Sequence, residues 1–463
     1  MIPAKKIYDK GFLKVADSKF VTDFTAGSVP RQLLTFALPL YLSNILQIVY
    51  NVADMVIVGQ VLGSVGLSAV AIGGDVTMFI NFFAMGFSGA GQVIAAQLLG
   101  ARQSQQLGRF IGNMASFLMA GGIFFMAVCL ILREEILQIM STPPESFDEA
   151  LAYATVTISG IVFIYGYNAV SAILRGLGDS KHPFIFISVA AVLNVALDVA
   201  FVIFLGMGAS GAAWATVISQ GVSFVSCVIF LYRHRPELGF EISAKDFVTP
   251  DRELLARLIK LGLPMAIRSA SIQTSKMFVN SWINSFGVVV SAFAGVGHKI
   301  SSVSMLLSNA LTMAGSSMVG QNIGARKFER VTKIMQTMAA VTFTIASAMS
   351  LTIWIFPREI YGVFTDDAAV IAVGMEYLPI AVLMFFGSAA RSPMMALING
   401  SGSTVANFLT ALFDGIILRI GLAVLFGLTL EMGYLGFWLG DACAGFTPLV
   451  IGLALYFSGK WKE

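Results

Sequence analysis

Long runs of hydrophobic residues alternate with short polar segments along almost the whole chain. A helix needs about 20 mostly apolar residues to cross the roughly 30 Å hydrocarbon core of a bilayer, and twelve stretches of this chain are long enough. They cover residues 33–56, 66–96, 110–132, 150–174, 184–205, 211–232, 257–286, 290–318, 334–356, 372–398, 405–428 and 434–458. The pattern therefore predicts an all-α polytopic membrane protein with twelve transmembrane helices.

The second half of this pattern repeats the first half. Gly100-Ala101-Arg102 lies 224 residues before Gly324-Ala325-Arg326, and Trp214 lies 224 residues before Trp438. Internal repeats of membrane helices are typical of secondary transporters, whose substrate binds between the repeats near the middle of the bilayer. Because each repeat has an even number of helices, we predict two six-helix lobes related by a pseudo-two-fold axis along the membrane normal.

The polar segments divide the chain into five predicted regions. These are a cytoplasmic N-terminal segment (1–31), an N-lobe of helices 1–6 (32–232), a cytoplasmic inter-lobe linker (233–256), a C-lobe of helices 7–12 (257–458) and a cytoplasmic C-terminus (459–463). The linker mixes apolar and charged residues, which suggests a helix that lies on the membrane surface.

Composition and charge placement agree with this topology. The chain is 57% hydrophobic and only 12% charged, against roughly 25% charged residues in soluble domains. Most of its 29 Lys and Arg residues fall in polar segments on the side that carries both termini. Positive residues accumulate in cytoplasmic loops, so we predict cytoplasmic termini in a multi-pass protein of the cell inner (plasma) membrane. The lipid bilayer is its expected partner, and nucleic acid is not.

Acidic residues inside the first predicted lobe need an explanation, because charge near the bilayer centre is unfavourable. Asp54 lies near the end of the first helix, and Asp198 follows Asn194 by four residues, which places the two side chains on one helix face. Thr216 in helix 6 and Tyr153 in helix 4 offer hydroxyl groups. Together these residues predict an all-oxygen site for a proton or for Na⁺. Alternatively, Asn194 and Asp198 bind neighbouring helices and Asp54 reaches water. With Na⁺ as the coupling ion, the metal ligands would be Asp54, Asn194, Asp198 and Thr216.

The second predicted lobe carries basic residues instead. Arg268 and Lys276 lie in helix 7 and Arg391 lies in helix 10. Asp414 and Arg419 are five residues apart and do not share an α-helical face, so we expect Asp414 to pair with Arg391 or Lys276. The basic residues are either structural ion-pair partners or a cationic wall that receives a carboxylate or phosphate of the substrate.

Flexible and aromatic side chains offer an apolar surface for the substrate. The candidates are Met78, Phe82 and Met305, which alternatively face lipid or pack between helices. An enzyme is not expected, because the three histidines lie in no catalytic motif and no phosphate-binding loop is present in the sequence. No cofactor is expected beyond the coupling ion, H⁺ or Na⁺.

Three segments resemble the multidrug and toxic compound extrusion (MATE) transporters. They are Asn51-Val52-Ala53-Asp54-Met55-Val56-Ile57-Val58-Gly59, Ala172-Ile173-Leu174-Arg175-Gly176-Leu177-Gly178-Asp179 and Asn194-Val195-Ala196-Leu197-Asp198. The resemblance implies a two-lobe antiporter that exports small organic compounds or drugs by alternating access, in exchange for H⁺ or Na⁺. It also implies that Asp54 is central to coupling, that Asn194, Asp198 and Thr216 complete the cation site, and that Tyr153 is a neighbour.

The resemblance is to the prokaryotic branch that couples through the first lobe, because predicted helix 7 contains no acid. We expect the protein to act as a monomer. Two alternatives stay open. One is an exporter of an anionic or zwitterionic metabolite bound by the basic C-lobe residues, and the other is a lipid-linked precursor flippase of related architecture.

Overall fold

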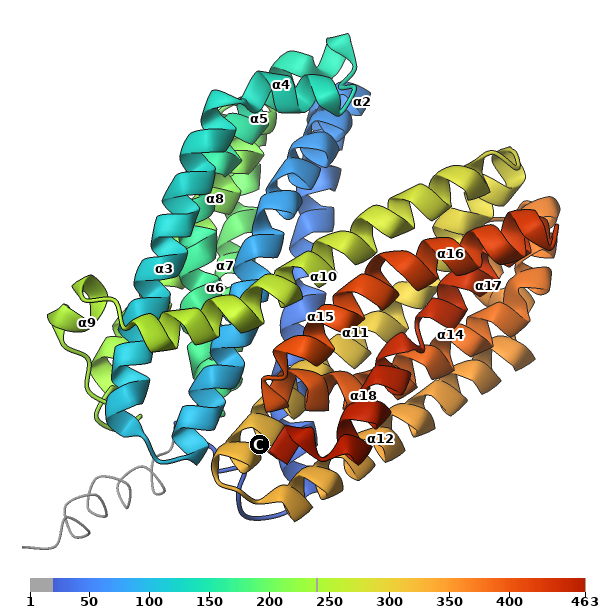
Figure 1. Cartoon of the computed structure of the whole chain (residues 1–463). Coiled ribbons are helices and arrows are strands. Elements are labelled where there is room, and N and C mark those ends of the chain that lie inside the picture. Colours follow the sequence, from blue (N-terminus) through green and yellow to red (C-terminus); the bar gives the residue numbers. More distant parts are fainter. Residues whose placement is uncertain (1–19, 239, 463) are drawn as a thin grey trace, which may run out of the picture. The chain divides into compact units, whose positions relative to one another are not determined.

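The computed structural model describes residues 20–238 and 240–462, so most of the predicted N-terminal segment lies outside the described residues (Figure 1). Every regular element in the described part is helical. The first half contains α2 (Val29–Gly100), α3 (Ser104–Ile131), α4 (Arg133–Ile139), α5 (Pro144–Ser159), α6 (Ile161–Gly176), α7 (Lys181–Asp198), the π-helix η2 (Val199–Phe204), α8 (Ala209–His234) and α9 (Ala244–Val248). The second half contains α10 (Arg252–Asn284), α11 (Val288–Gly324), α12 (Phe328–Ile355), α13 (Pro357–Gly362), α14 (Ala368–Ser401), α15 (Thr404–Leu412), η3 (Phe413–Ile417), α16 (Leu418–Val424), η4 (Leu425–Thr429), α17 (Gly433–Ala444), α18 (Thr447–Ser458) and η5 (Lys460–Lys462).

The helices account for the predicted spans. Among the described residues, nine helices are long and apolar enough to cross a membrane, and α5 with α6 forms a tenth span bent by 44°. α2 contains two predicted spans, and its backbone leaves the helical conformation at Gly63, where φ is 63°. α10 has 33 residues, but Arg268 and Lys276 lower its hydropathy. Counted in this way, the spans number twelve, and the predicted fold class is confirmed.

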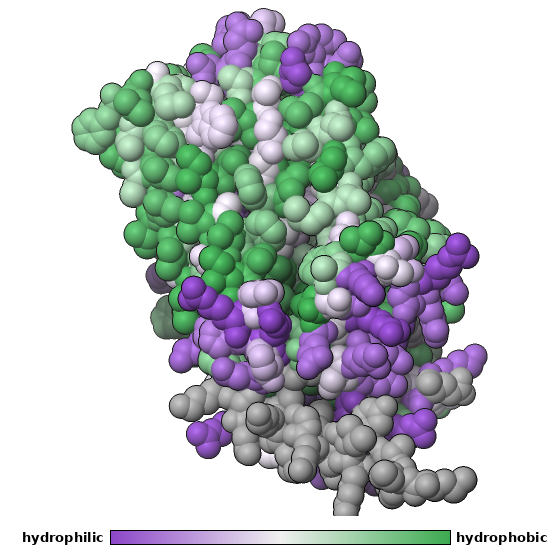
Figure 2. Space-filling model, turned by 90° about the vertical axis from the view of Figure 1, so that its left-hand side faces the viewer, coloured by the Kyte–Doolittle hydropathy of each residue, from purple (hydrophilic) through white to green (hydrophobic). Residues whose placement is uncertain are grey.

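The surface supports a membrane location. Large apolar side chains point outward along the long helices, for example Val192 with 74% and Leu351 with 61% of the side chain exposed. Figure 2 shows hydrophobic side chains over the middle of the face that it presents, with hydrophilic side chains gathered at the two ends. Such a band matches the hydrocarbon core of a bilayer between two polar interfaces.

The repeat is visible in backbone geometry. Arg102 and Arg326 have φ angles of 59° and 57°, a left-handed conformation that is uncommon outside glycine. They end the same type of turn, which follows α2 in the first repeat and α11 in the second. η2 and η4 also lie close to equivalent positions of the two repeats.

The chain forms two compact units. Of the described residues, unit 1 contains 20–23, 38–238 and 240–263, and unit 2 contains 24–37 and 264–462. The chain therefore changes unit inside α2 and inside α10, each time within two residues of a helical proline, Pro39 or Pro264. Compared with the predicted lobes, unit 1 also holds residues 233–256, and the start of the predicted N-lobe belongs to unit 2.

The predicted linker is anchored within unit 1. Asn113 of α3 donates from Nδ2 to the Asp246 carbonyl at 3.0 Å and accepts from the Asp251 amide at 2.6 Å. Besides the end of α8 and the start of α10, the described residues of the linker contain one short helix, α9. This helix ends at Val248 because Thr249 precedes a proline and takes an extended conformation.

Aromatic residues fill the core of each unit. In unit 1, the fully buried Tyr165 stacks on Phe83 and donates its hydroxyl to the Ile80 carbonyl at 2.7 Å. In unit 2, Phe293 packs edge-on against Tyr361, Tyr377 and Trp438. These cores hold the helices that carry the buried charges described next.

Candidate cation site and basic network

The predicted acidic residues of unit 1 come together between three helices. Thr216 on α8 donates its hydroxyl to Asp54 Oδ2 on α2 at 3.4 Å, and it accepts from Asn194 Nδ2 on α7 at 3.4 Å. Asp198, one turn after Asn194 on α7, is an electrostatic neighbour of Asp54. The structure thus gathers four residues that are separated by up to 162 positions in the sequence.

These groups are sealed from solvent. Asp54 is 4% exposed, Asn194 is 1% exposed and Asp198 is fully buried. Four of their oxygen atoms, Asp54 Oδ1, Asn194 Oδ1 and both carboxylate oxygens of Asp198, accept no hydrogen bond from any described residue. A buried acceptor left without a donor destabilises a fold by about 1–3 kcal/mol.

A basic side chain does not neutralise the pair. Ion pairs in the described part of the chain are formed by other acids, among them Asp179, Asp414 and Asp441. Two adjacent carboxylates without a countercharge favour a bound cation or proton, because desolvation and mutual repulsion oppose two negative charges. Their oxygen atoms, with those of Asn194 and Thr216, are the hard ligands that a proton or an alkali cation accepts.

Two tyrosines surround the acidic pair. Tyr153 on α5 is 7% exposed and is an electrostatic neighbour of Asp54 and Asp198. Tyr50 lies one turn before Asp54 and accepts from Gln220 Nε2 at 3.4 Å. Tyr50 and Gln220 were not predicted, although each lies four residues from a predicted site residue, Asp54 or Thr216, on the same helix.

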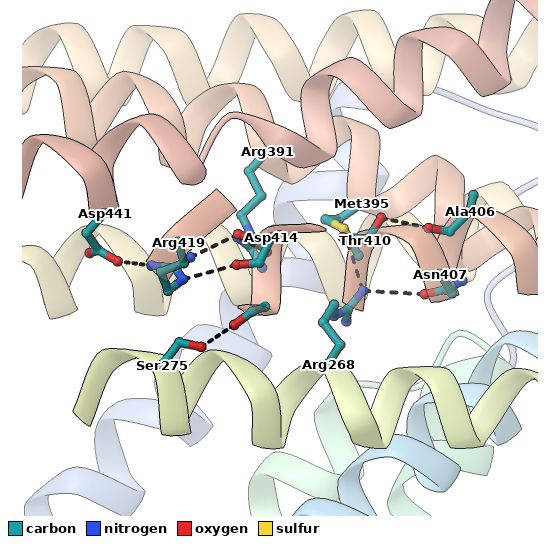
Figure 3. Close-up of polar contacts among 11 residues, drawn as sticks. Arg268, Ser275, Arg391, Met395, Ala406, Asn407, Thr410, Asp414, Arg419 and Asp441 are labelled. Atoms are coloured by element: carbon teal, nitrogen blue, oxygen red, sulfur yellow. Dashed lines mark hydrogen bonds and ion pairs between the residues drawn. The ribbon is translucent and has the colours of Figure 1, made fainter. Parts of the chain in front are cut away.

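The basic residues of unit 2 form an ion-pair network (Figure 3). The fully buried Asp414 bridges two arginines, with 2.8 Å from Oδ2 to Arg391 Nη1 and 2.9 Å from Oδ1 to Arg419 Nη2. Arg419 also pairs with Asp441 of α17. The predicted Asp414–Arg391 pair is confirmed. Asp441 was not predicted, although an acid inside an apolar span is itself a signal.

The predicted separation of Asp414 from Arg419 is wrong. Asp414 lies in η3, where the backbone is π-helical, and Arg419 follows two residues after η3 ends. π-Helical hydrogen bonds join residues five apart rather than four, so two side chains at this spacing reach the same face. The α-helical period does not apply there.

The remaining predicted substrate residues differ in their surroundings. Among the described residues, Arg268 of α10 donates hydrogen bonds only to neutral groups, Asn407 Oδ1 at 3.4 Å and Met395 Sδ at 3.6 Å. Phe82 is 8% exposed and packs edge-on against Phe79. Met78 and Met305 are each 40% exposed. Their predicted role in substrate binding stays a prediction.

Two repeats of membrane-spanning helices that enclose buried charges define a polytopic membrane transporter. A family model described as MatE matches the chain twice, at residues 39–200 and 264–425. The chain belongs to the MatE family, as its motifs predicted, and it is a transporter rather than an enzyme.

Similar proteins span nearly the whole chain. The "Probable multidrug resistance protein YpnP" of Bacillus subtilis is 29% identical over 447 residues, which cover 95% of this chain and 97% of that protein. The "Probable multidrug resistance protein YoeA" of the same organism is 26% identical and covers 94% and 95%. A solved structure described as "Crystal structure of MATE in the bent conformation" matches with a TM-score of 0.86 and 23% identity, covering 95% of this chain and 96% of that chain. This last likeness concerns the fold.

Proposed function

We propose that the protein is a cation-coupled antiporter that exports organic compounds by alternating access, with Asp54 and Asp198 as the coupling pair. The observation that carries the proposal is the set of four buried acceptor oxygens on Asp54, Asn194 and Asp198. A proton or Na⁺ bound among them supplies the missing partner. The names of YpnP and YoeA, which describe multidrug resistance proteins, support an organic cargo.

The site couples a cation to conformation because its groups come from three helices. Asp54 belongs to α2, Asn194 and Asp198 to α7, and Thr216 to α8. A cation held by all of them favours the arrangement in which these helices are close. A ligand drives a transition only by binding one conformation better than the other. Loading and release of the cation therefore shift the balance between the two access states.

The proposal also covers the orientation of the protein, its membrane, its oligomeric state and its coupling ion. Both termini are cytoplasmic, the membrane is the inner (plasma) membrane, and the protein acts as a monomer. It needs no cofactor beyond the coupling ion. The donor set accepts either H⁺ or Na⁺, so the test imposes the two gradients separately.

The test is gradient-driven dye transport in proteoliposomes that contain the full-length protein. Two dyes with the same xanthene framework and opposite charge, rhodamine 123 and fluorescein, are supplied under an imposed pH gradient or an imposed Na⁺ gradient. We expect at least one gradient to drive transport of at least one dye. Asp54→Asn and Asp198→Asn should each abolish the gradient-dependent part.

Asp75→Asn is the matched control, because Asp75 is an exposed acid in the same helix as Asp54. It should transport at the wild-type rate. Full gradient-driven transport by Asp54→Asn, at equal protein content, would contradict the assignment of the coupling pair.

A further inference from the structure

The charges of the unit 2 network do not balance. Four basic side chains, Arg268, Lys276, Arg391 and Arg419, lie among two carboxylates, Asp414 and Asp441. Asp414 forms ion pairs with two arginines, Arg391 and Arg419, and Asp441 forms an ion pair with Arg419. Two positive charges thus remain without a partner of their own within this network. Uncompensated charge inside a membrane protein is unfavourable and marks sites of function.

Asn407 orients the guanidinium group of Arg268 and leaves two of its donors available to a ligand. The Asn407 side chain is fully buried, and its Nδ2 donates to the carbonyls of Ile398 and Ser403. These two bonds fix the amide, so that its Oδ1 faces Arg268 (Figure 3). Both of these hydrogen bonds of Arg268, to Asn407 and to Met395, leave from Nη1. Within the described part of the chain, Nε and Nη2 donate to no protein acceptor, and these two donors match the two oxygens of a carboxylate, sulfonate or phosphate.

Lys276 extends this surface along the same helix. It lies eight residues after Arg268, which is a rise of roughly 12 Å. It forms no ion pair with a described residue, and its acidic neighbour Asp441 is the acceptor of Arg419. Arg391 is an electrostatic neighbour of both Arg268 and Lys276. All three side chains are partly exposed rather than fully buried.

We propose that Arg268 and Lys276 bind the acidic group of an organic anion, and that organic anions are therefore the cargo class of this transporter. The inference rests on the proposed export function and specifies its substrate. Arg268 supplies a directed two-donor contact, Lys276 supplies a mobile charge, and Arg391 is a positioning residue held by Asp414. The other titratable side chain beside Lys276 is His298 of α11, which adds no negative charge.

Equilibrium binding to the purified full-length protein in detergent tests the proposal. Fluorescein and rhodamine 123 are titrated separately and followed by fluorescence anisotropy. We expect fluorescein to bind, and we expect Arg268→Gln and Lys276→Gln each to weaken its binding about tenfold or more, the effect of losing one charge-assisted contact. Arg268→Lys keeps the charge but loses the paired donors, and it should give an intermediate loss. Rhodamine 123 binding should not weaken in any of these variants.

Controls separate a binding role from a structural one. Arg358→Gln removes an exposed basic residue of α13 and should leave fluorescein binding unchanged. Size-exclusion profiles identify variants that fail to fold. If Arg268→Gln fails to fold, the folded Lys276→Gln variant, which breaks no hydrogen bond with a described residue, tests the proposal in its place. The proposal is overturned if the wild type binds rhodamine 123 but not fluorescein, or if folded Lys276→Gln and Arg268→Lys bind fluorescein as the wild type does.

The binding test stands apart from the coupling test because it uses no gradient. Loss of fluorescein binding in the basic variants, together with full gradient-driven transport by Asp54→Asn, would support the cargo class and refute the coupling pair. Unchanged fluorescein binding in the basic variants, together with transport abolished by Asp54→Asn, would refute the cargo class alone.

Discussion

The backbone of Gly73 lies directly against the ring of Tyr153. A Cβ atom at position 73 would lie 2.4 Å from Tyr153 Cδ1 and 3.1 Å from Cε1. Gly73 thus lets the ring of α5 approach α2 at the level of the acidic pair, where Tyr153 neighbours Asp54 and Asp198. The next residue, Gly74, has no atom within 4 Å of the same position.

We expect Gly73→Ala to destabilise the protein and Gly74→Ala to do the opposite. Overpacking a buried contact is unfavourable by about 1–3 kcal/mol, whereas Gly→Ala in an open helical position gains up to about 1 kcal/mol. Thermal unfolding of the two purified variants measures the difference. Adding Tyr153→Leu to Gly73→Ala should recover part of the loss. Equal unfolding midpoints for the two alanine variants would show that the Tyr153 ring is not constrained by α2.

Asp414 should be the acid that contributes most to the thermal stability of unit 2. Asp414→Asn keeps the shape of the side chain but leaves Arg391 and Arg419 without their shared carboxylate. Breaking a buried pair from one side typically destabilises by about 3–5 kcal/mol. We therefore expect a clearly lower unfolding midpoint than for Asp366→Asn, which changes an exposed acid. A midpoint as high as that of the Asp366 variant would mean that the network adds no stability.

Thr216 should set how tightly the coupling cation binds. Thr216→Val keeps the side-chain shape but removes the hydroxyl that donates to Asp54 and accepts from Asn194. A lost buried hydrogen bond of about 1–3 kcal/mol corresponds to a change of about fivefold or more in the half-saturating cation concentration. Where Na⁺ is the coupling ion, the concentration rises, because valine offers no ligand oxygen. Transport rates measured at increasing cation concentration give this half-saturating concentration. Thr216→Ser keeps the hydroxyl and should behave as the wild type.

Regular α-helical spacing explains what could be predicted from the sequence. The twelve apolar runs and their repeat are enough to predict the fold class. Backbone groups in the hydrocarbon core need hydrogen-bond partners within the protein, and a run of about 20 apolar residues meets this need as a helix. Asn194 and Asp198 share a face because α7 is regular up to Asp198. The candidate acids could be recognised because few charges are tolerated inside such helices.

The errors have equally specific causes. The Asp414–Arg419 pair depends on a π-helical turn, and no feature of the local sequence had indicated that the α-helical period fails there. Tyr50 and Gln220 were missed because the prediction did not extend one helical turn from Asp54 and from Thr216.

Infrared difference spectroscopy of the purified protein tests the central claim most directly, because it reports protonated and ionised carboxyl groups separately. We compare spectra before and after cation loading, with H⁺ and with Na⁺. We expect a carboxyl signal that changes on loading in the wild type and in Asp75→Asn, and that is missing from the Asp54→Asn/Asp198→Asn double variant. The same loading signal in the folded double variant would contradict the claim.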